Sequence, residues 1–268
     1  MNLWNIGFNI SGCYLKRGRE MKSRIALLLI LAISLMETTA FAGPPAQGKL
    51  NKLPGKEVVD PASWPRWVAG AKQGVRTGLP QWVDKAGLVG GIINGSIVTG
   101  GALAGPPLLP MISGKMKNAG APDRIVAGFM GPVAEAWTAW SASVRVPGLA
   151  WYPSFEMFPG PVAPPTPGPA APLMSLTQVA TPLTPSMLAQ AIRTRLGNDA
   201  SSPETQAAIV EFCAWFYSGF SSWRLTATIR GVIGTGRVPH FAPPIVPGGR
   251  VIDGTANGGK ILPQPVWP

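Results

Sequence analysis

One uncharged, glycine-rich stretch constrains the fold of this chain more than any other feature. Residues 86–114 read AGLVGGIINGSIVTGGALAGPPLLPMISG, and no charged side chain occurs between Lys85 and Lys115. Glycines recur there at intervals of four, and residues four apart share one face of a helix. The spacing predicts a bare groove at which another backbone approaches closely, formed by Gly87, Gly91, Gly95, Gly101 and Gly105.

Three structures are compatible with this stretch. A transmembrane helix fits the length of Ala86–Gly105, and small residues suit helix packing in lipid, although prolines follow from Pro106 onward. A tightly packed buried helix or helical hairpin is the interpretation that we prefer. A β-hairpin is the third, because Asn94-Gly95 between β-branched residues is a strong turn signal.

The N-terminal residues resemble an export signal. Basic residues between Lys16 and Arg24 precede the apolar run Ile25–Met36, and small residues end at Ala42. This pattern predicts a Sec-type signal peptide over 1–42, with Met21 as the better start codon. We therefore expect an exported protein that is periplasmic, envelope-associated or extracellular.

The composition indicates an ordered but irregular protein. The chain has 33 Gly and 30 Pro, yet it keeps 10 Trp and 46% hydrophobic residues, whereas a disordered chain has few aromatics. Of 23 Lys/Arg and 12 Asp/Glu, five basic and two acidic residues fall in 1–42, so the remainder carries about +8. An anionic membrane surface or envelope polymer is therefore a candidate partner. No nucleic-acid-binding motif occurs, so we expect no nucleic acid partner.

We expect an extended arm over 43–62 and a glycine-rich, helical core region over 63–145. Ser63 is expected to cap a short helix that has Pro65 in its first turn. A longer helix is predicted from Asp123, as N-cap, to Val144. Within it Pro132 should produce a kink or a break.

A second helical region is predicted over 183–236. Thr184 should cap a helix that begins at Pro185 and ends at Leu196. Ser201 and Glu204 have the spacing of a capping box for a longer helix, which is expected to run as far as Ile233 with an apolar face from Ala208 to Trp223.

Two segments are expected to be extended. Residues 146–182 are rich in Pro and aromatics and cannot build a core of their own, so their rings should pack on the helices or on another molecule. The tail 237–268 should contribute at most one edge strand, and its PVWP end should dock in cis or on a neighbouring subunit. The aromatic candidates for interaction are Trp137, Trp140, Trp151, Tyr152, Phe155 and Phe158.

Little in the sequence favours catalysis. His240 is the single histidine, and Cys213, which lies among aromatics at helical spacing, is expected to be a small buried hydrophobe. One His and one Cys cannot supply a zinc site, so no metal, cofactor or catalytic residue is predicted. A glycan-cleaving carboxylate pair drawn from Glu135, Glu156 and Glu211 remains a minor alternative.

The sequence thus predicts a mainly α protein with a few helices, long irregular Pro/Gly-rich segments and room for one short β-hairpin. The preferred function is that of a non-enzymatic structural or assembly protein of a cell-envelope or extracellular complex, acting through protein partners or self-association. The alternative is a membrane-inserting protein that uses residues 86–105. A glycan-binding or glycan-cleaving protein comes third.

Overall fold

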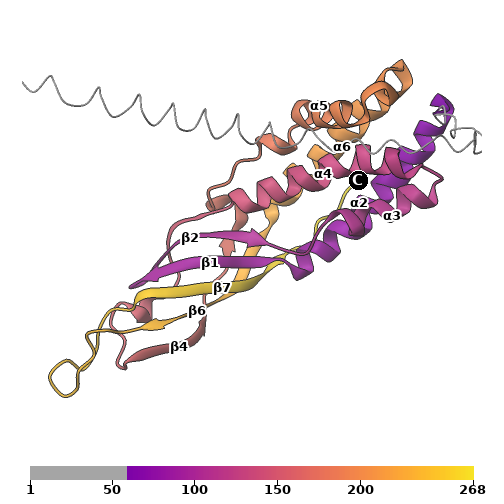
Figure 1. Ribbon diagram of the computed structural model, residues 1–268. Coiled ribbons are helices and arrows are strands. Elements are labelled where there is room, and N and C mark those ends of the chain that lie inside the picture. The colour runs from indigo at the N-terminus through magenta and orange to yellow at the C-terminus, as the bar shows by residue number, and fades with distance from the viewer. Residues whose placement is uncertain (1–58) are drawn as a thin grey trace, which may run out of the picture. The chain divides into compact units, whose positions relative to one another are not determined.

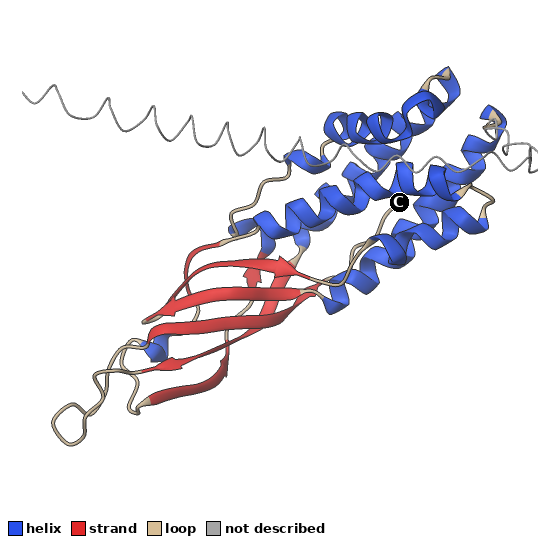
Figure 2. Cartoon of the chain, viewed as in Figure 1, coloured by secondary structure: helices blue, strands red, loops and turns tan. Residues whose placement is uncertain are grey.

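The computed structural model describes residues 59–268, and these form a mixed α and β unit (Figure 2). The prediction of a mainly α fold is therefore wrong, because a seven-stranded antiparallel sheet accompanies the helices. The predicted signal peptide and nearly all of the predicted arm lie outside the described residues. Helices gather at one end of the described unit and strands at the other (Figure 1).

The α-helices of the described residues are α2 (Trp64–Lys85), α3 (Leu109–Asn118), α4 (Asp123–Ser143), α5 (Pro185–Leu196) and α6 (Pro203–Thr226). The strands are β1 (Gly87–Asn94), β2 (Ile97–Ala104), β3 (Val146–Ala150), β4 (Val162–Pro167), β5 (Ala171–Pro172), β6 (Thr228–Arg237) and β7 (Ile252–Leu262). Their order in the sheet is β3-β2-β1-β7-β6-β4, and β5 also pairs with β6.

The uncharged stretch 86–114 forms the hairpin β1–β2, then a loop and the start of α3. Neither the preferred buried helix nor the membrane-spanning helix is present at residues 86–105. Asn94 pairs with Ile97, so the two turn residues are Gly95, with φ +61°, and Ser96, one position later than the Asn-Gly turn expected. None of the helices in 59–268 has both the length and the apolar character needed to span a bilayer.

The glycines of this stretch do allow close backbone approach, but between strands. A Cβ on Gly91 would lie 2.9 Å from the carbonyl oxygen of Ala256 on β7. The interval of four does not place Gly87 and Gly91 on one face of β1, because the strand is irregular between Leu88 and Gly91. The glycines thus allow close packing between strands and do not form a helix groove.

The largest correction concerns the C-terminal region. Residues 237–268 were expected to give an extended tail with at most an edge strand, but β7 lies at the centre of the sheet, paired with β1 and β6. Its sequence, IDGTANGGKIL, has no apolar run that would mark a central strand. The final PVWP does dock in cis, because Trp267 Nε1 donates to the carbonyl oxygen of Phe216 on α6 at 3.0 Å.

The predicted helices agree with the structure more closely than the predicted extended segments do. α5 and its N-cap Thr184 lie where the sequence placed them. α4 ends one residue before the predicted Val144, runs without a break through Pro132, and has Pro122 rather than Asp123 as its N-cap. The helix after Ser63 is not short, since α2 continues to Lys85.

The last helix is the main exception. α6 stops at Thr226, and the residues expected to continue it to Ile233 form β6 instead. Its N-cap is Ser202, whose Oγ accepts the N–H of Thr205 at 3.2 Å, so the predicted capping box at Ser201 does not form.

The helical end has a core of large rings. Trp137 of α4 is fully buried and its ring lies 5.3 Å from that of Trp82 on α2 and 6.0 Å from that of Phe220 on α6. Cys213 is also fully buried in this core, as predicted, and burial raises the pKa of its thiol to about 12.

The sheet end packs its inner face on the segment that follows β3. Tyr152 and Phe155 stack with ring centroids 4.9 Å apart, and the Tyr152 hydroxyl donates to the carbonyl oxygen of Val232 on β6 at 2.7 Å. Gly234 lies beneath the same ring, where a Cβ would come within 2.4 Å of Tyr152 Cζ. The residues between 146 and 182 therefore form part of a core, through short strands and turns, in place of the extended arm expected.

Candidate interaction surfaces

The residues predicted as interaction sites lie mostly inside the protein. The rings of Trp137, Trp140, Trp151, Tyr152 and Phe155 are buried, and that of Phe158 is packed against the core. Four of the predicted glycines lie in β1, β2 or their turn, and Gly105 follows β2 with its Cα facing the Trp82 ring. The aromatic rings therefore lie in or against the core. Of the glycines only Gly91 and Gly95 are buried, and Gly105 is exposed, so the five form no common surface groove.

A different set of apolar side chains is exposed on the side of the sheet that faces away from the core. Along β1, Leu88 and Ile93 are buried, while Val89 and Ile92 are 53% and 48% exposed. On neighbouring strands Ile97 is 38% exposed and Ile233 is 40% exposed. Val89 and Ile92 are three residues apart, so alternation alone would place them on opposite faces, but the register shift between Leu88 and Gly91 interrupts the alternation and leaves both exposed. With Ile97 and Ile233 they lie on the outer face of the sheet.

The strand register shows that this outer surface is continuous. Ile92 is paired with Thr99 on β2 and with Thr255 on β7, and Ile233 on β6 is paired with Asn257 on β7. Directly paired residues in antiparallel strands point to the same side. We call this surface the outer sheet face, and it comprises Val89, Ile92, Ile97, Thr99, Ile233, Thr255 and Asn257.

Charged residues occur only toward the ends of the outer sheet face. β1 and β2 contain no charged residue. Arg230 on β6 is paired with Lys260 on β7 near one end, while Arg237 and Asp253 lie toward the other. The outer sheet face is uncharged in its middle but not wholly apolar, because Thr255 and Asn257 of β7 lie between Ile92 and Ile233. Exposed aliphatic side chains with polar residues around them are typical of a surface that binds another macromolecule.

Prolines block the edges of the sheet. β3 pairs only with β2 and contains Pro147, while β4 pairs only with β6 and contains Pro164, Pro165 and Pro167. Proline has no N–H to donate to a further strand, and edge prolines are a common protection against strand addition. Addition of a further strand at either edge of the sheet is therefore disfavoured.

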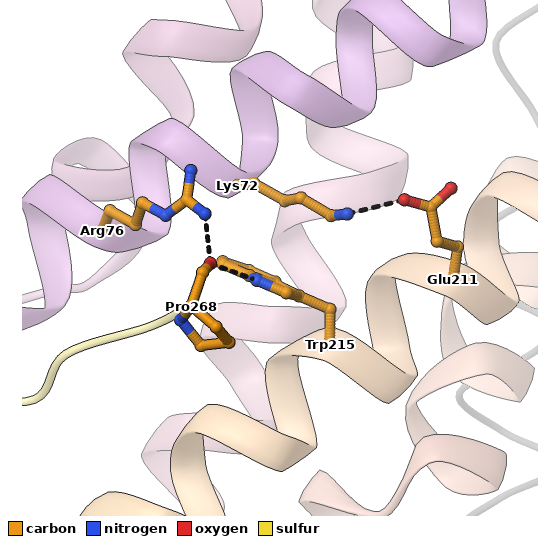
Figure 3. Close-up of polar contacts among 5 residues, drawn as sticks. All are labelled: Lys72, Arg76, Glu211, Trp215 and Pro268. Atoms are coloured by element: carbon orange, nitrogen blue, oxygen red, sulfur yellow. Dashed lines mark hydrogen bonds and ion pairs between the residues drawn. The ribbon is translucent and has the colours of Figure 1, made fainter.

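A polar cluster at the helical end ties α2, α6 and the C-terminal segment together (Figure 3). Lys72 of α2 forms an ion pair with Glu211 of α6 at 2.6 Å, and its Nζ lies 5.5 Å from the centre of the Trp215 ring. The Pro268 carbonyl oxygen accepts from Trp215 Nε1 at 2.9 Å and also from Arg76. These contacts close the helical end around the docked tail.

The three carboxylates considered as a glycan-cleaving pair lie in separate ion pairs. Glu135 binds Arg195 at 2.9 Å, Glu156 binds Arg250 at 2.6 Å, and Glu211 binds Lys72. Hydrogen bonds from Arg250 and from the Ser96 N–H lower the pKa of Glu156 below its ordinary value of 4.5. An ionised carboxylate that already binds a cation is poorly suited to act as a general acid.

The single histidine and Cys213 lie in different parts of the described residues. His240 is exposed in the connection between β6 and β7, and Cys213 is buried with a raised pKa. Within residues 59–268 no group of three or more His, Cys, Asp or Glu is placed to hold a metal ion.

Comparison with known proteins gives no relative: no protein-family model matches, and neither a curated protein nor a solved structure is significantly similar. The functional argument therefore depends on the surfaces of this chain alone.

The sequence does contain a signal for the outer sheet face, in two pairs of adjacent apolar residues. In a sheet that has one covered face, the two members of an adjacent apolar pair such as Leu88-Val89 or Ile92-Ile93 cannot both be buried. Once the hairpin is accepted, one member of each pair must be exposed.

Proposed function

We propose that the protein is an exported, non-enzymatic assembly protein that binds a partner protein through the outer sheet face. The observation that carries this proposal is the exposure of Val89, Ile92, Ile97 and Ile233 on one uncharged part of the sheet. Removal of such aliphatic surface from water stabilises a complex by about 25 cal/mol per Å² before the entropic costs of association.

Two further features support the proposal. The edges of the sheet contain prolines, so that addition of a strand from another chain is disfavoured. Among residues 59–268 no group of three or more His, Cys, Asp or Glu is placed to hold a metal ion. Export rests on the predicted signal peptide at 1–42.

The test compares two aspartate substitutions of equally exposed aliphatic residues. Ile92→Asp places a charge at the centre of the outer sheet face, whereas Val210→Asp places one on α6, where Val210 is 51% exposed. The tagged full-length protein is purified under mild conditions from the cell that makes it, and its mass is measured by size-exclusion chromatography with light scattering.

We expect the unsubstituted protein and Val210→Asp to elute as one complex of defined mass above that of the single chain. Ile92→Asp should elute as the single chain with an unfolding midpoint close to that of the unsubstituted protein, because exposed substitutions usually change stability by less than about 0.5 kcal/mol. Identical elution of the two variants, or a single-chain mass for all three proteins, would contradict the proposal.

A further inference from the structure

A second surface lies at the helical end, away from the outer sheet face. The N-terminal parts of α2, as far as Lys72, and of α6, as far as Glu211, enclose a cleft with a volume of about 700 Å³ together with the short 3-10 helix η1 (Pro61–Ser63). Volumes in this range are typical of sites that hold a small molecule or a few residues of a peptide.

The shape of the cleft follows from residue spacing on the two helices. Trp64, Val68 and Lys72 are four apart on α2 and therefore lie along one side of that helix. On α6, Ala207 and Ala208 lie on the facing side between two carboxylates. Alanine side chains are too short to fill the space between the helices, so an apolar cleft remains open.

The charges in the cleft are unbalanced. Asp60, Glu204 and Glu211 line it, and the one cation is Lys72, which already forms an ion pair with Glu211 at 2.6 Å. Asp60 Oδ1 accepts the N–H of Ala62 at 3.0 Å. Glu204 has neither a hydrogen bond nor an ion pair among residues 59–268. The lining therefore has three carboxylates against one ammonium group.

We propose that this cleft binds a short peptide segment of a partner protein in which lysine or arginine alternates with aliphatic residues. The aliphatic part of the peptide would lie against Val68 and Ala207, and its cation would bind Glu204 beside Asp60. Charge complementarity selects this occupant, since an acidic peptide would bring a further negative charge to an unpaired carboxylate. The proposal is independent of the outer sheet face.

Three fluorescein-labelled probe peptides test the charge requirement on the full chain: AKLAKLA, AQLAQLA and AELAELA. Fluorescence anisotropy should show saturable binding of AKLAKLA that weakens as salt is raised, because exposed ion pairs are screened. AQLAQLA should bind more weakly, and AELAELA should not bind. Equal affinity for AKLAKLA and AQLAQLA would overturn the proposal.

Two substitutions locate the binding, and one serves as the control. Glu204→Gln should weaken AKLAKLA binding about two- to fivefold, the range expected for one exposed ion pair. Ala207→Leu, at an exposed position on α6, should weaken it by filling the cleft without a change of charge. Glu135→Gln removes a carboxylate that lies on α4 and pairs with Arg195, and it should leave the affinity unchanged.

The outcomes separate the peptide from other cations. If Glu135→Gln lowers the affinity as much as Glu204→Gln does, the peptide binds by general surface charge and the proposal fails. The proposal also fails if spermine binds the protein while AKLAKLA does not, because the occupant is then a small polyamine. Loss of peptide binding in Ala207→Leu with unchanged circular dichroism supports it.

Discussion

The ring cluster around Trp137 at the helical end and the sheet end of this protein achieve close packing by opposite means. At the helical end, Trp137, Phe220 and neighbouring rings fill the space between helices. At the sheet end, the strands lack side chains where packing is tightest, and Tyr152 lies directly against the backbone at Gly234. The ring cluster depends on the bulk of its side chains, and the sheet end on their absence. The contact of α2 with α3 is of the second kind, because a Cβ on Gly74 would lie 1.9 Å from the Ile112 carbonyl oxygen.

This difference explains why one half was easier to predict. Large apolar residues at intervals of three and four identify a helix face, so the positions of α4 and α5 followed from the sequence. A strand made of Gly, Thr and Asn gives no such signal, although its glycines are what permits the approach of β7 to β1.

The largest expected effect is at the helical end. Trp137→Ala should lower the free energy of unfolding by about 3–5 kcal/mol, because it removes a fully buried ring and leaves a cavity. Urea unfolding followed by circular dichroism measures the change. Trp215→Ala, at the half-buried edge of the same helical core, should cost less, and an equal loss in the two variants would contradict a core centred on Trp137.

A substitution at the sheet end should destabilise by the opposite change, an added methyl group. Gly234→Ala places a Cβ 2.4 Å from Tyr152 Cζ and should lower the free energy of unfolding by about 1–3 kcal/mol. The matched control is Gly114→Ala in α3, where a Cβ would meet no atom within 4 Å. That control should be stabilised by up to about 1 kcal/mol, and destabilisation of both variants to the same degree would refute the packing argument.

The smallest expected change in stability is at Tyr152 in the sheet end, and it depends on pH. Tyr152→Phe removes the hydrogen bond to the Val232 carbonyl and should cost about 1 kcal/mol at neutral pH. Burial raises the pKa of Tyr152 from 10.0 to about 12, so the folded protein favours the neutral phenol. The stability that this provides is complete below pH 10 and is lost as the pH rises through 12.

The unsubstituted protein should therefore lose stability more steeply between pH 10 and 12 than Tyr152→Phe does. Burial raises the pKa of the Cys213 thiol as well, but both proteins contain that residue, so its contribution cancels in the difference. Unfolding midpoints measured across this range provide the check. Parallel curves for the two proteins would show that Tyr152 is not buried as a neutral phenol.

The fold could be predicted from the sequence only in part. The 184–196 helix, most of the 123–144 helix and the burial of Cys213 follow from local patterns. The length of α6 does not, because residues 228–233 continue its apolar pattern and become a strand only through pairing with β7. The central position of β7 depends on partners that are more than 150 residues away in β1, and local propensity does not report such pairings.

The candidate surfaces also could not be predicted from local sequence patterns. The glycines and aromatics chosen as interaction residues are unusual in the sequence because the core requires them. The outer sheet face consists of ordinary residues such as Val89 and Ile233, and only the register of the strands places them together. The cleft depends likewise on the contact of α2 with α6, which no local pattern predicted.

Site-specific photo-crosslinking in the cell that makes the protein tests the proposed function most directly. A photoreactive phenylalanine analogue is placed at Ile92 on the outer sheet face or at the equally exposed Val210 on α6. We expect irradiation to yield one covalent protein adduct of defined mass from position 92 and none from position 210. Adducts of the same pattern from both positions, or none from position 92, would show that the outer sheet face is not the surface through which this protein assembles.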